Sequence, residues 1–520
     1  MCVIITIAPV RNFVRRDIVV QIKRLIWPAS FIGVTLSAAS TAASHSGALA
    51  AAPETLIGVN VTSPNYYSHQ RAFANLAIGD SWRIVHAPKE WSEFPREYVL
   101  SDGGLSGLPA GSNAVRMLTA PVTGAGGANI RCTWQGGGTI VAKGAVSGLF
   151  TNSNQLSFHW VNDWKSSVYL QVSSVDPQKP IRKVDCRETD IAGQELFAPA
   201  FVKDLTGYKV LRFMDWSRSN FNVPVTWATR TQPGSIEVNR ADGVAIEDMM
   251  ALAMETGASP WFSLPWNADH DYYQRYAQYV HDTLPTNRTV YVELGNEIWN
   301  TGFPASKQAT AEGLASGLAD NPRQANLRRL AQRTVEVMKI WEQVFADNPK
   351  RLVRVIATQH VVPDAAAQVL AYGDTAAHVD ALATAPYFGL DLMQEGQTAD
   401  LDEIFRRLDN RIDKTIDLAL ANRAVAAKYG KRYVGYEAGQ HIVIPYNVPL
   451  TIQIQHNQRM YDVYKRYIKE WRTRVGDTIN FFGSVGVIGP GGAWGLVEHS
   501  GQPASEAPKL RAVLEERDHS

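Results

Sequence analysis

Candidate strands alternate with helical periodicity over most of this 520-residue chain, and this alternation constrains the fold more than any other feature. Between the strands, stretches such as 246–254, 327–341 and 412–429 repeat apolar residues three and four positions apart, which is the pattern of a helix with one buried face. The expected strands cover residues 208–214, 260–266, 289–294, 352–358, 379–387, 432–437 and 478–482. A closing helix is expected over 505–516. Repeated β/α units of this kind predict an α/β fold around a parallel sheet.

An eighth strand is available upstream, in the segment Leu-Ile-Gly-Val-Asn-Val at residues 56–61. The region between it and the repeats has a different pattern, in which Leu156, Phe158 and Trp160 alternate with polar residues and glycine clusters mark turns. Period-two alternation is typical of strands with one buried face. We therefore predict a (β/α)8 TIM barrel with an all-β, sandwich-like domain inserted after strand one. The expected parts are strand one at 55–62, the inserted domain at 63–196 and the remaining barrel at 197–520. A doubly wound open sheet stays as the alternative, because periodicity does not show closure.

The first 50 residues have the pattern of an export signal. A basic stretch precedes a short apolar run at 25–36, and small residues follow up to Ala48-Leu49-Ala50, which fits a cleavage site. We expect a bacterial protein of the periplasm or the cell exterior, with no stable membrane insertion after the signal is removed; an uncleaved anchor is the alternative. Removal would leave Cys132 and Cys186, either as one disulfide or as two buried thiols.

The charge balance excludes two classes of partner. The chain has 51 basic and 50 acidic side chains, so its net charge of +1 gives no electrostatic attraction to nucleic acid or to an anionic membrane surface. The sequence does contain 14 tryptophans and 19 tyrosines, and flat rings of this kind pack well against the C–H face of a sugar. The amino-acid composition is therefore compatible with a carbohydrate ligand, although aromatic residues also fill protein cores.

Two glutamates follow short apolar strands at the positions where chemistry is expected. Glu297 lies in the segment Leu-Gly-Asn-Glu-Ile-Trp-Asn, and Glu437 lies in Val-Gly-Tyr-Glu-Ala-Gly. In the strand count above they end strands four and seven, and catalytic residues of a β/α barrel lie at the C-terminal strand ends. Glycosidic bond cleavage needs two carboxyl groups, one to donate a proton and one to attack the sugar carbon. The pair therefore predicts a glycoside hydrolase.

The ordered motifs resemble those of the clan A retaining glycoside hydrolases, which include cellulase-like and mannanase-like enzymes. The resemblance covers the barrel and rests on Gly-Asn-Glu after strand four and on Glu437 at the end of strand seven. The whole arrangement is also similar to a group of exported bacterial proteins. They share the Gly-Val-Asn start, an inserted β-domain, the segment Leu-Arg-Phe-Met-Asp-Trp at 211–216, and Asn-Glu-x-Trp-Asn. That second resemblance implies no particular sugar.

The clan resemblance implies a role for the residues of this sequence that match the clan motifs. Glu297 would be the acid/base and Glu437 the nucleophile, with the carboxyl groups roughly 5 Å apart and a covalent glycosyl-enzyme intermediate. Asn296 would hydrogen-bond the sugar 2-hydroxyl, and Trp494 would be the stacking floor for the sugar. The further expected substrate-binding residues are Arg212 and Tyr387, which would hold the nucleophile ionised, and Trp216, Trp266 and Trp299 near strand ends.

Several competing interpretations can be weighed from the residues. Glu293 lies four positions before Glu297 and could replace it, but its place inside a strand fits a buried ion pair better. The segment Gly79-Asp80-Ser81-Trp82 is similar to the nucleophile block of small serine esterases, but it does not follow a buried strand. The histidines and cysteines lack metal-ligand spacing, so we expect neither a catalytic metal nor a cofactor.

The sequence as a whole predicts a monomeric retaining glycoside hydrolase acting on a β-linked polysaccharide or oligosaccharide. Two alternatives stay open: a barrel that binds glycans without cleaving them, and a transglycosylase, which differs from a hydrolase only in the acceptor. The inserted β-domain follows strand one, at the catalytic end of the barrel, so we expect it to shape the cleft.

Overall fold

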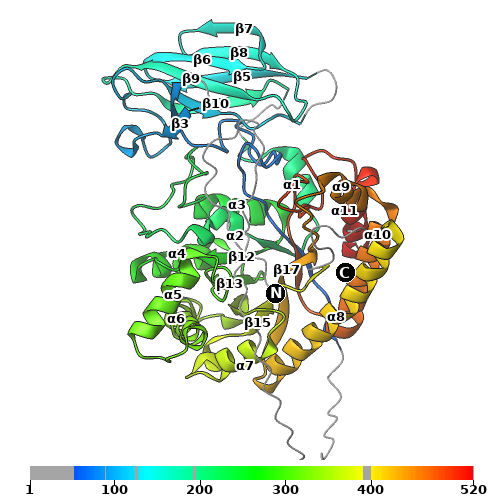
Figure 1. The fold of residues 1–520 in the computed structure, drawn as a ribbon. Helices are drawn as coiled ribbons and strands as arrows, with labels where there is room; N and C mark the ends of the chain where they lie inside the picture. The colour runs from blue at the N-terminus through cyan, green and yellow to red at the C-terminus, as the bar shows by residue number, and fades with distance from the viewer. Residues whose placement is uncertain (1–51, 88–89, 123–126, 191–194, 390–399, 519–520) are drawn as a thin grey trace, which may run out of the picture.

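The computed structural model describes residues 52–87, 90–122, 127–190, 195–389 and 400–518, and its centre is a closed parallel barrel (Figure 1). Neighbouring strands pair in chain order, β1 pairs with both β11 and β18, and the pairing of β15 with β17 completes the ring. The predicted (β/α)8 barrel is therefore confirmed, and the open doubly wound sheet was wrong. The barrel strands are β1 (Ile57–Asn60), β11 (Val210–Arg212), β12 (Ser259–Leu264), β13 (Val290–Leu294), β14 (Leu352–Ala357), β15 (Ala381–Thr384), β17 (Arg432–Gln440) and β18 (Ile479–Phe481).

Helices follow the strands and cover the outside of the barrel (Figure 1). Capping residues mark several helix starts: the side chains of Asp269 and Asp400 accept hydrogen bonds from the first turns of α4 and α8. Helix α3 ends at Gly257, whose φ of 83° suits glycine. The longer helices are α1 (Pro199–Leu205), α3 (Ile246–Thr256), α4 (His270–Thr283), α5 (Pro304–Ala315), α6 (Pro322–Val344), α7 (Pro363–Ala371), α8 (Leu401–Lys428), α9 (Val448–His456), α10 (Gln458–Glu470) and α11 (Pro508–Arg517).

The interior of the barrel is filled by side chains that alternate along the strands. Trp261 and Tyr291 stack inside it with ring centroids 5.2 Å apart, and small residues of β14 and β15 fill the remaining space. Gly58 of β1 has a specific reason to be glycine, because a Cβ there would lie 1.9 Å from Oδ1 of Asn480 on β18. The Gly-Val-Asn start of the barrel thus lets β1 and β18 approach closely.

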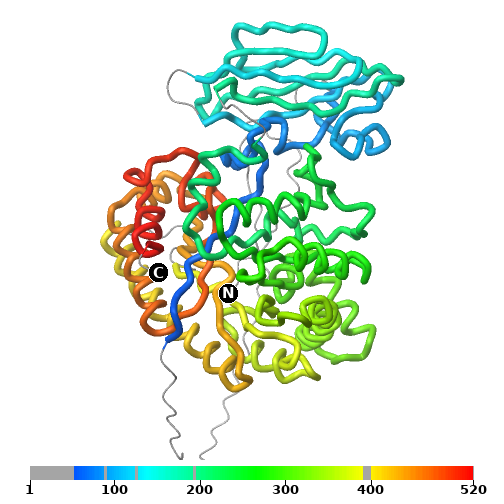
Figure 2. Tube along the Cα trace, turned by 180° about the vertical axis from the view of Figure 1, so that it is seen from behind, coloured from blue at the N-terminus to red at the C-terminus, as the bar shows by residue number. Residues whose placement is uncertain are grey.

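The region between β1 and α1 forms two antiparallel sheets at the end of the barrel to which β1 leads (Figures 1 and 2). One sheet has the order β3-β2-β4-β9-β6 and the other β10-β5-β8-β7. In β8 the side chains of Leu156, Phe158 and Trp160 are buried, as the alternation in the sequence predicted. The sandwich-like inserted domain is confirmed. Its strands are β2 (Arg83–Ala87), β3 (Glu90–Glu93), β4 (Ala114–Met117), β5 (Ala128–Gln135), β6 (Gly138–Gly144), β7 (Ser147–Asn152), β8 (Gln155–Trp160), β9 (Val168–Val175) and β10 (Arg182–Glu188).

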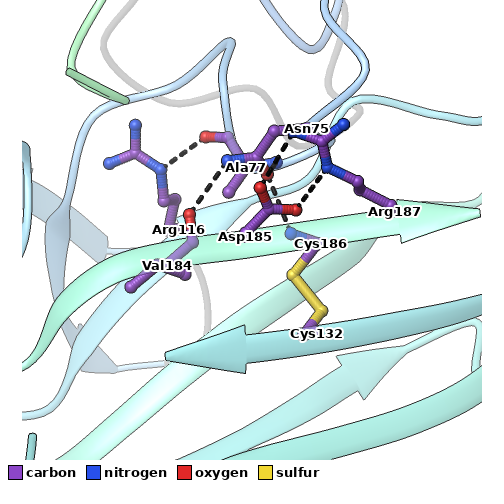
Figure 3. Close-up of a disulfide and its surroundings, with 8 residues drawn as sticks. All are labelled: Asn75, Ala77, Arg116, Cys132, Val184, Asp185, Cys186 and Arg187. Atoms are coloured by element: carbon purple, nitrogen blue, oxygen red, sulfur yellow. Dashed lines mark hydrogen bonds and ion pairs between the residues drawn. A yellow bond between two sulfur atoms is a disulfide. The ribbon is translucent and has the colours of Figure 1, made fainter. Parts of the chain in front are cut away.

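Cys132 and Cys186 form a disulfide between the paired strands β5 and β10 (Figure 3). Of the two alternatives that the sequence left open, the disulfide is the one found. Beside it, the side chain of Asn75 accepts hydrogen bonds from the backbone N–H groups of Ala77 and Cys186. The segment that leads from the barrel into the β-domain is therefore attached to the edge of its four-stranded sheet.

The β-domain is attached to the mouth of the barrel by a stack of three rings. Trp164, between β8 and β9, lies between His69 and His499, with centroid distances of 4.9 and 5.0 Å. His69 belongs to the loop after β1 and His499 to the loop after β18, both at the C-terminal ends of barrel strands. The domain thus contacts the catalytic end of the barrel.

Within the described ranges, no helix is both long enough and apolar enough to cross a membrane. The predicted export signal at 1–50 lies outside the described residues, so export stays a prediction.

Candidate active site

Glu297 stands on a tight turn directly after β13. Gly295 and Glu297 both have positive φ values, 71° and 46°, so the backbone turns sharply at the end of the strand. Nδ2 of Asn326 donates to the carbonyl of Ile298 at 3.0 Å and fixes the turn from α6. A non-glycine residue in the left-handed region carries strain, and such residues gather at functional sites. The turn brings the carboxyl of Glu297 back over the barrel.

Glu437 lies at a β-bulge in β17. Along β18 the partners of Gly435 and Ala438 are two residues apart, so β17 has one extra residue at this point. In a regular strand Tyr436 and Glu437 would face opposite sides. With the bulge, the Tyr436 ring lies in the barrel interior and contacts both Arg212 and Glu297, while the Glu437 side chain also reaches Arg212.

Arg212, at the end of β11, connects the charged groups. Its guanidinium is fully buried and donates to Oε1 of Glu437 at 2.8 Å and to Oε2 of Glu293 at 3.0 Å. It also donates to the side-chain oxygens of Asn60 at 2.9 Å and Asn296 at 2.7 Å. Four partners on or just after three strands, β1, β13 and β17, fix the orientation of one cation. Arg212 therefore holds Glu437 in place as an ion-paired carboxylate.

The second oxygen of Glu437 accepts a hydrogen bond from the Tyr387 hydroxyl at 3.1 Å. Tyr387 belongs to β16 (Tyr387–Phe388), which pairs with the far end of β17. Each carboxylate oxygen of Glu437 thus has a donor, as expected for Arg212 and Tyr387 from the sequence. The two donors fix the direction in which the Glu437 carboxyl group points.

The surroundings of Glu297 are different. Its carboxyl accepts hydrogen bonds from the Tyr436 hydroxyl at 2.9 Å and from Nδ2 of Asn300 at 2.8 Å, and no cation pairs with it among the described residues. Burial, together with the negative charge of Glu437, raises the pKa of Glu297 to about 7. The two carboxyl groups are therefore unequal: Glu437 is paired with a cation, whereas Glu297 holds a proton near neutral pH.

Asn296 is buried, and both ends of its amide have partners. Its oxygen accepts from Arg212, and its Nδ2 donates to Oδ1 of Asn220 at 3.0 Å. The amide is thereby fixed beside Glu437 and Glu297. One hydrogen of Nδ2 is committed to Asn220, so the predicted contact to a sugar hydroxyl would have to use the other.

Trp494 lies beside Tyr387 at the mouth of the barrel. Its ring meets Tyr387 edge to face at 5.5 Å and His441 at 4.6 Å, and it is only half-buried. This is a suitable position for a sugar-stacking residue. Trp299 is half-buried as well, and its role stays a prediction.

Two predicted substrate-binding tryptophans are corrected by the structure. Trp216 is fully buried and stacks on Phe201 and Phe73, beneath the β-domain. Trp266 is 2% exposed, with its ring in the barrel wall near Arg329. Both belong to the core, because a large apolar ring near a strand end can fill the space between strand and helix as readily as line a cleft.

Several residues of this cluster were missed by the sequence reasoning. Tyr436 was overlooked because strand alternation puts it on the opposite face from Glu437, and only the flanking glycines hint at a bulge. Asn60 binds Arg212 and donates to the carbonyl of Tyr436 at 2.9 Å; its place at the end of strand one was the available signal. Nothing in the sequence around Asn220, which lies on the long loop after β11, indicated that it belongs to the site.

The rival interpretations find no support in the geometry. Glu293 is 1% exposed and binds Arg212 and the indole of Trp261, which places it beneath the cleft as a partner for the arginine. The hydroxyl of Ser81 has no hydrogen-bond partner among the described residues, so no base activates it. The same part of the chain contains no cluster of three or more side chains able to hold a metal ion.

No family model matches this chain, and no curated protein matches it in sequence. Similar solved structures are glycoside hydrolases. A family 51 arabinofuranosidase from Xanthomonas axonopodis pv. citri is 14% identical, with 57% of this chain and 62% of that chain covered and a TM-score of 0.40. A family 5 xyloglucanase from Paenibacillus pabuli is 12% identical, covers 64% of this chain and 93% of its own, and has a TM-score of 0.39. A family 1 β-glucosidase from Thermotoga maritima is 11% identical, with coverages of 61% and 85% and a TM-score of 0.35.

This chain therefore spans less than two thirds of the length of the arabinofuranosidase that it resembles. At these identities the likeness does not extend to activity, and the barrel itself is established by the strand pairing described above.

Proposed function

We propose that this protein is a retaining glycoside hydrolase that cleaves a β-linked polysaccharide or oligosaccharide by double displacement. The observation that carries the proposal is the inequality of the two carboxyl groups. Glu437 is bound by a buried arginine and a tyrosine, whereas Glu297 forms no ion pair with a described residue and has a pKa of about 7. A carboxylate held by a cation and a second carboxyl that can donate a proton, both at the same end of the barrel, are what glycoside cleavage requires.

In the first step, the Glu437 carboxylate attacks the anomeric carbon while Glu297 gives its proton to the leaving oxygen. Arg212 and Tyr387 keep Glu437 ionised and aimed, so that little reorganisation is needed when the bond forms. The loss of the proton makes Glu297 anionic, and the Tyr436 and Asn300 hydrogen bonds then stabilise it.

In the second step, Glu297 accepts a proton from water as the water attacks the glycosyl ester. The products are a sugar with its original anomeric configuration and Glu437 restored as a carboxylate. With a sugar hydroxyl in place of water, the same step gives transglycosylation. The two outcomes differ in products and not in the residues used.

The test is a screen of the wild-type protein on β-glycans and aryl β-glycosides, with Glu297→Gln, Glu437→Gln and the control Glu506→Gln measured alongside. Glu506 is an exposed glutamate outside the cluster described above, and its variant should keep the wild-type rate. The two site variants should lose at least about a hundredfold in rate, the usual contribution of such a group.

Two further measurements separate the alternatives. A 2-fluoro sugar with a good leaving group should label Glu437, as read by peptide mass spectrometry. NMR of the first-formed product should show retention. Labelling of any other residue, inversion, or a site variant with near-wild-type rate would refute the assignment. Binding of a glycan without any cleavage would favour a non-catalytic barrel.

A further inference from the structure

The long loop after β11 presents an arginine on an aromatic ring beside the catalytic cluster. Arg218 follows the short helix α2 (Met214–Ser217) and has a φ of 53°, in the left-handed region. Its Cζ lies 4.0 Å from the ring centre of Phe221, and 50% of Phe221 is exposed. The guanidinium is therefore held flat on a ring that faces solvent.

The side chain of Arg218 makes no hydrogen bond or ion pair with any residue that the structure describes, and its Nε is buried. The negative charges of Asp215 and Asp242 act on Arg218, but their close contacts are with other groups: Asp215 accepts from the backbone N–H of Ser63 at 3.3 Å, and Asp242 pairs with Arg96 at 3.6 Å. Burial lowers the pKa of Arg218.

A partly desolvated cation without a bonded counter-ion costs free energy, and buried polar groups left unpaired in a native structure call for an explanation. The neighbouring Ser219 hydroxyl and Asn222 Oδ1 are also buried without partners among the described residues. Three residues of one loop, Arg218, Ser219 and Asn222, thus carry buried hydrogen-bonding atoms that have no partner among the described residues. A ligand with acceptor oxygens would satisfy the cation.

The loop is joined to the proposed catalytic residues by direct contact. Asn220, two residues after Arg218, accepts the hydrogen bond from Asn296, which in turn binds Arg212. Tyr67, from the loop after β1, is 55% exposed, and the positive charge of Arg218 acts on its hydroxyl. Gly243 leaves room for the arginine stem, since a Cβ there would lie 3.0 Å from its Cγ.

We propose that Arg218, supported by Phe221 and flanked by Tyr67, binds the carboxylate of an acidic sugar, so that the substrate is a uronate-containing β-glycan. The inference rests on the proposed glycoside hydrolase function and specifies its substrate class. An arginine fork matches a carboxylate through two parallel N–H···O bonds, and exposed aromatic rings accept the C–H face of the sugar. The other cation of the site, Arg212, is already neutralised by Glu293 and Glu437, which leaves Arg218 for the charge of the substrate.

The test measures binding separately from cleavage. Isothermal titration of the slow Glu297→Gln protein would compare β-1,4-linked glucuronate and mannuronate hexamers with cellohexaose and mannohexaose. Glu297→Gln is the suitable background because glutamine resembles the protonated acid, whereas a change at Glu437 would leave Arg212 with unbalanced charge. The same titrations would be made with Arg218→Ala, Arg218→Lys and the control Arg406→Ala added, Arg406 being exposed on α8.

We expect at least one acidic hexamer to bind tenfold or more tightly than its neutral counterpart. Arg218→Ala should remove most of that preference, Arg218→Lys should restore part of it, and Arg406→Ala should leave it unchanged. A sulfated cellohexaose that binds more tightly than the uronates would overturn the assignment to a carboxylate.

The inference and the proposed function fail in different ways. Equal binding of acidic and neutral hexamers, no binding of any hexamer, or a preference that survives Arg218→Ala would overturn the inference. Cleavage of neutral glycans by the wild type in that case would leave the proposed function standing. Arg218-dependent binding of a uronate without cleavage by the wild type would support the inference and refute the proposed hydrolase.

Discussion

The hydrogen bond from Tyr436 to Glu297 should set the upper limit of the pH range in which the protein is active. The Tyr436 hydroxyl lies 2.9 Å from Oε1 of Glu297 and stabilises its ionised form, which lowers the pKa of Glu297 against the effect of burial. Tyr436→Phe keeps the ring that packs on Arg212 and removes only this donor. The variant should therefore shift the titration of Glu297 to higher pH without a change in the cluster's packing.

The size of the shift follows from the strength of the bond. A hydrogen bond to a charged group is worth about 1.5–3 kcal/mol, and the protonated acid keeps part of it, so a net loss of about 1.4 kcal/mol corresponds to about one pKa unit. From a pKa of about 7, the acid would move to about 8. At pH 8 its protonated fraction would then rise from about one tenth to about one half, a fivefold gain relative to each protein's own optimum.

The assay is the pH dependence of kcat/KM for a substrate with a poor leaving group, because protonation by Glu297 limits the rate only there. The alkaline limb should move upward by about one unit in Tyr436→Phe, with a lower maximum rate from looser positioning. Tyr433→Phe is the matched control: its hydroxyl lies on the same strand but contacts Thr384 at 2.6 Å and no carboxyl group. An alkaline limb that stays within 0.3 unit of wild type, or that moves equally in the control, would refute the reasoning.

Four other outcomes can be checked independently. Arg212→Met should lower the free energy of unfolding by about 3–5 kcal/mol in urea titrations, because it leaves Glu293 and Glu437 buried without their cation; a loss below about 1 kcal/mol would contradict this. The double variant Cys132→Ala/Cys186→Ala should have a free energy of unfolding about 2–4 kcal/mol lower than that of the oxidised wild type, since the disulfide joins residues 54 positions apart. Reducing agent should leave the midpoint of the variant's urea unfolding curve unchanged. Burial raises the pKa of Asp248 to about 7, so the folded protein keeps this carboxyl protonated at low pH, and the stability that this gives is lost as the pH rises from about 4 through 7. Asp248→Asn should therefore raise the melting temperature at pH 8 and have little effect on it at pH 4. Equal changes in melting temperature at both pH values would count against this explanation. Trp494→Ala should raise KM more than it lowers kcat on short glycans, and an unchanged KM would exclude stacking there.

Local patterns were sufficient to predict the barrel strands because parallel strands in a covered barrel are short, apolar and bounded by polar turns. Helix α10 was not predicted, although Met460, Val463, Tyr464 and Tyr467 have the spacing of a buried helix face. The count of eight β/α units predicts a barrel, but periodicity could not show its closure, which depends on the pairing of β1 with β18, the first and last barrel strands.

The residues of the candidate site also form two groups, those that could be predicted from the sequence and those that could not. Glu297 and Glu437 could be named because each comes at the end of a counted barrel strand, and Arg212 and Tyr387 because they fill positions of the clan pattern that the sequence resembles. The placement of Trp216 and Trp266 could not be predicted, because it depends on which neighbours fill the space around a strand end. The role of Tyr436 depends on a bulge of one residue, and no alternation pattern shows such a shift in advance.

The position of β1 has a consequence for how the chain assembles. This strand is made first, yet one neighbour, β11, follows about 150 residues later, and the other, β18, is almost the last element of the chain. Closing an unstructured loop of that length would cost about 4 kcal/mol of chain entropy. A β-domain that folds early and brings its two ends together reduces that cost before β1 and β11 meet. Until β18 arrives, however, one edge of β1 has no partner, and an open strand edge invites pairing with other chains. Strand β18 (Ile479–Phe481) is therefore the element that protects the open edge of the first barrel strand.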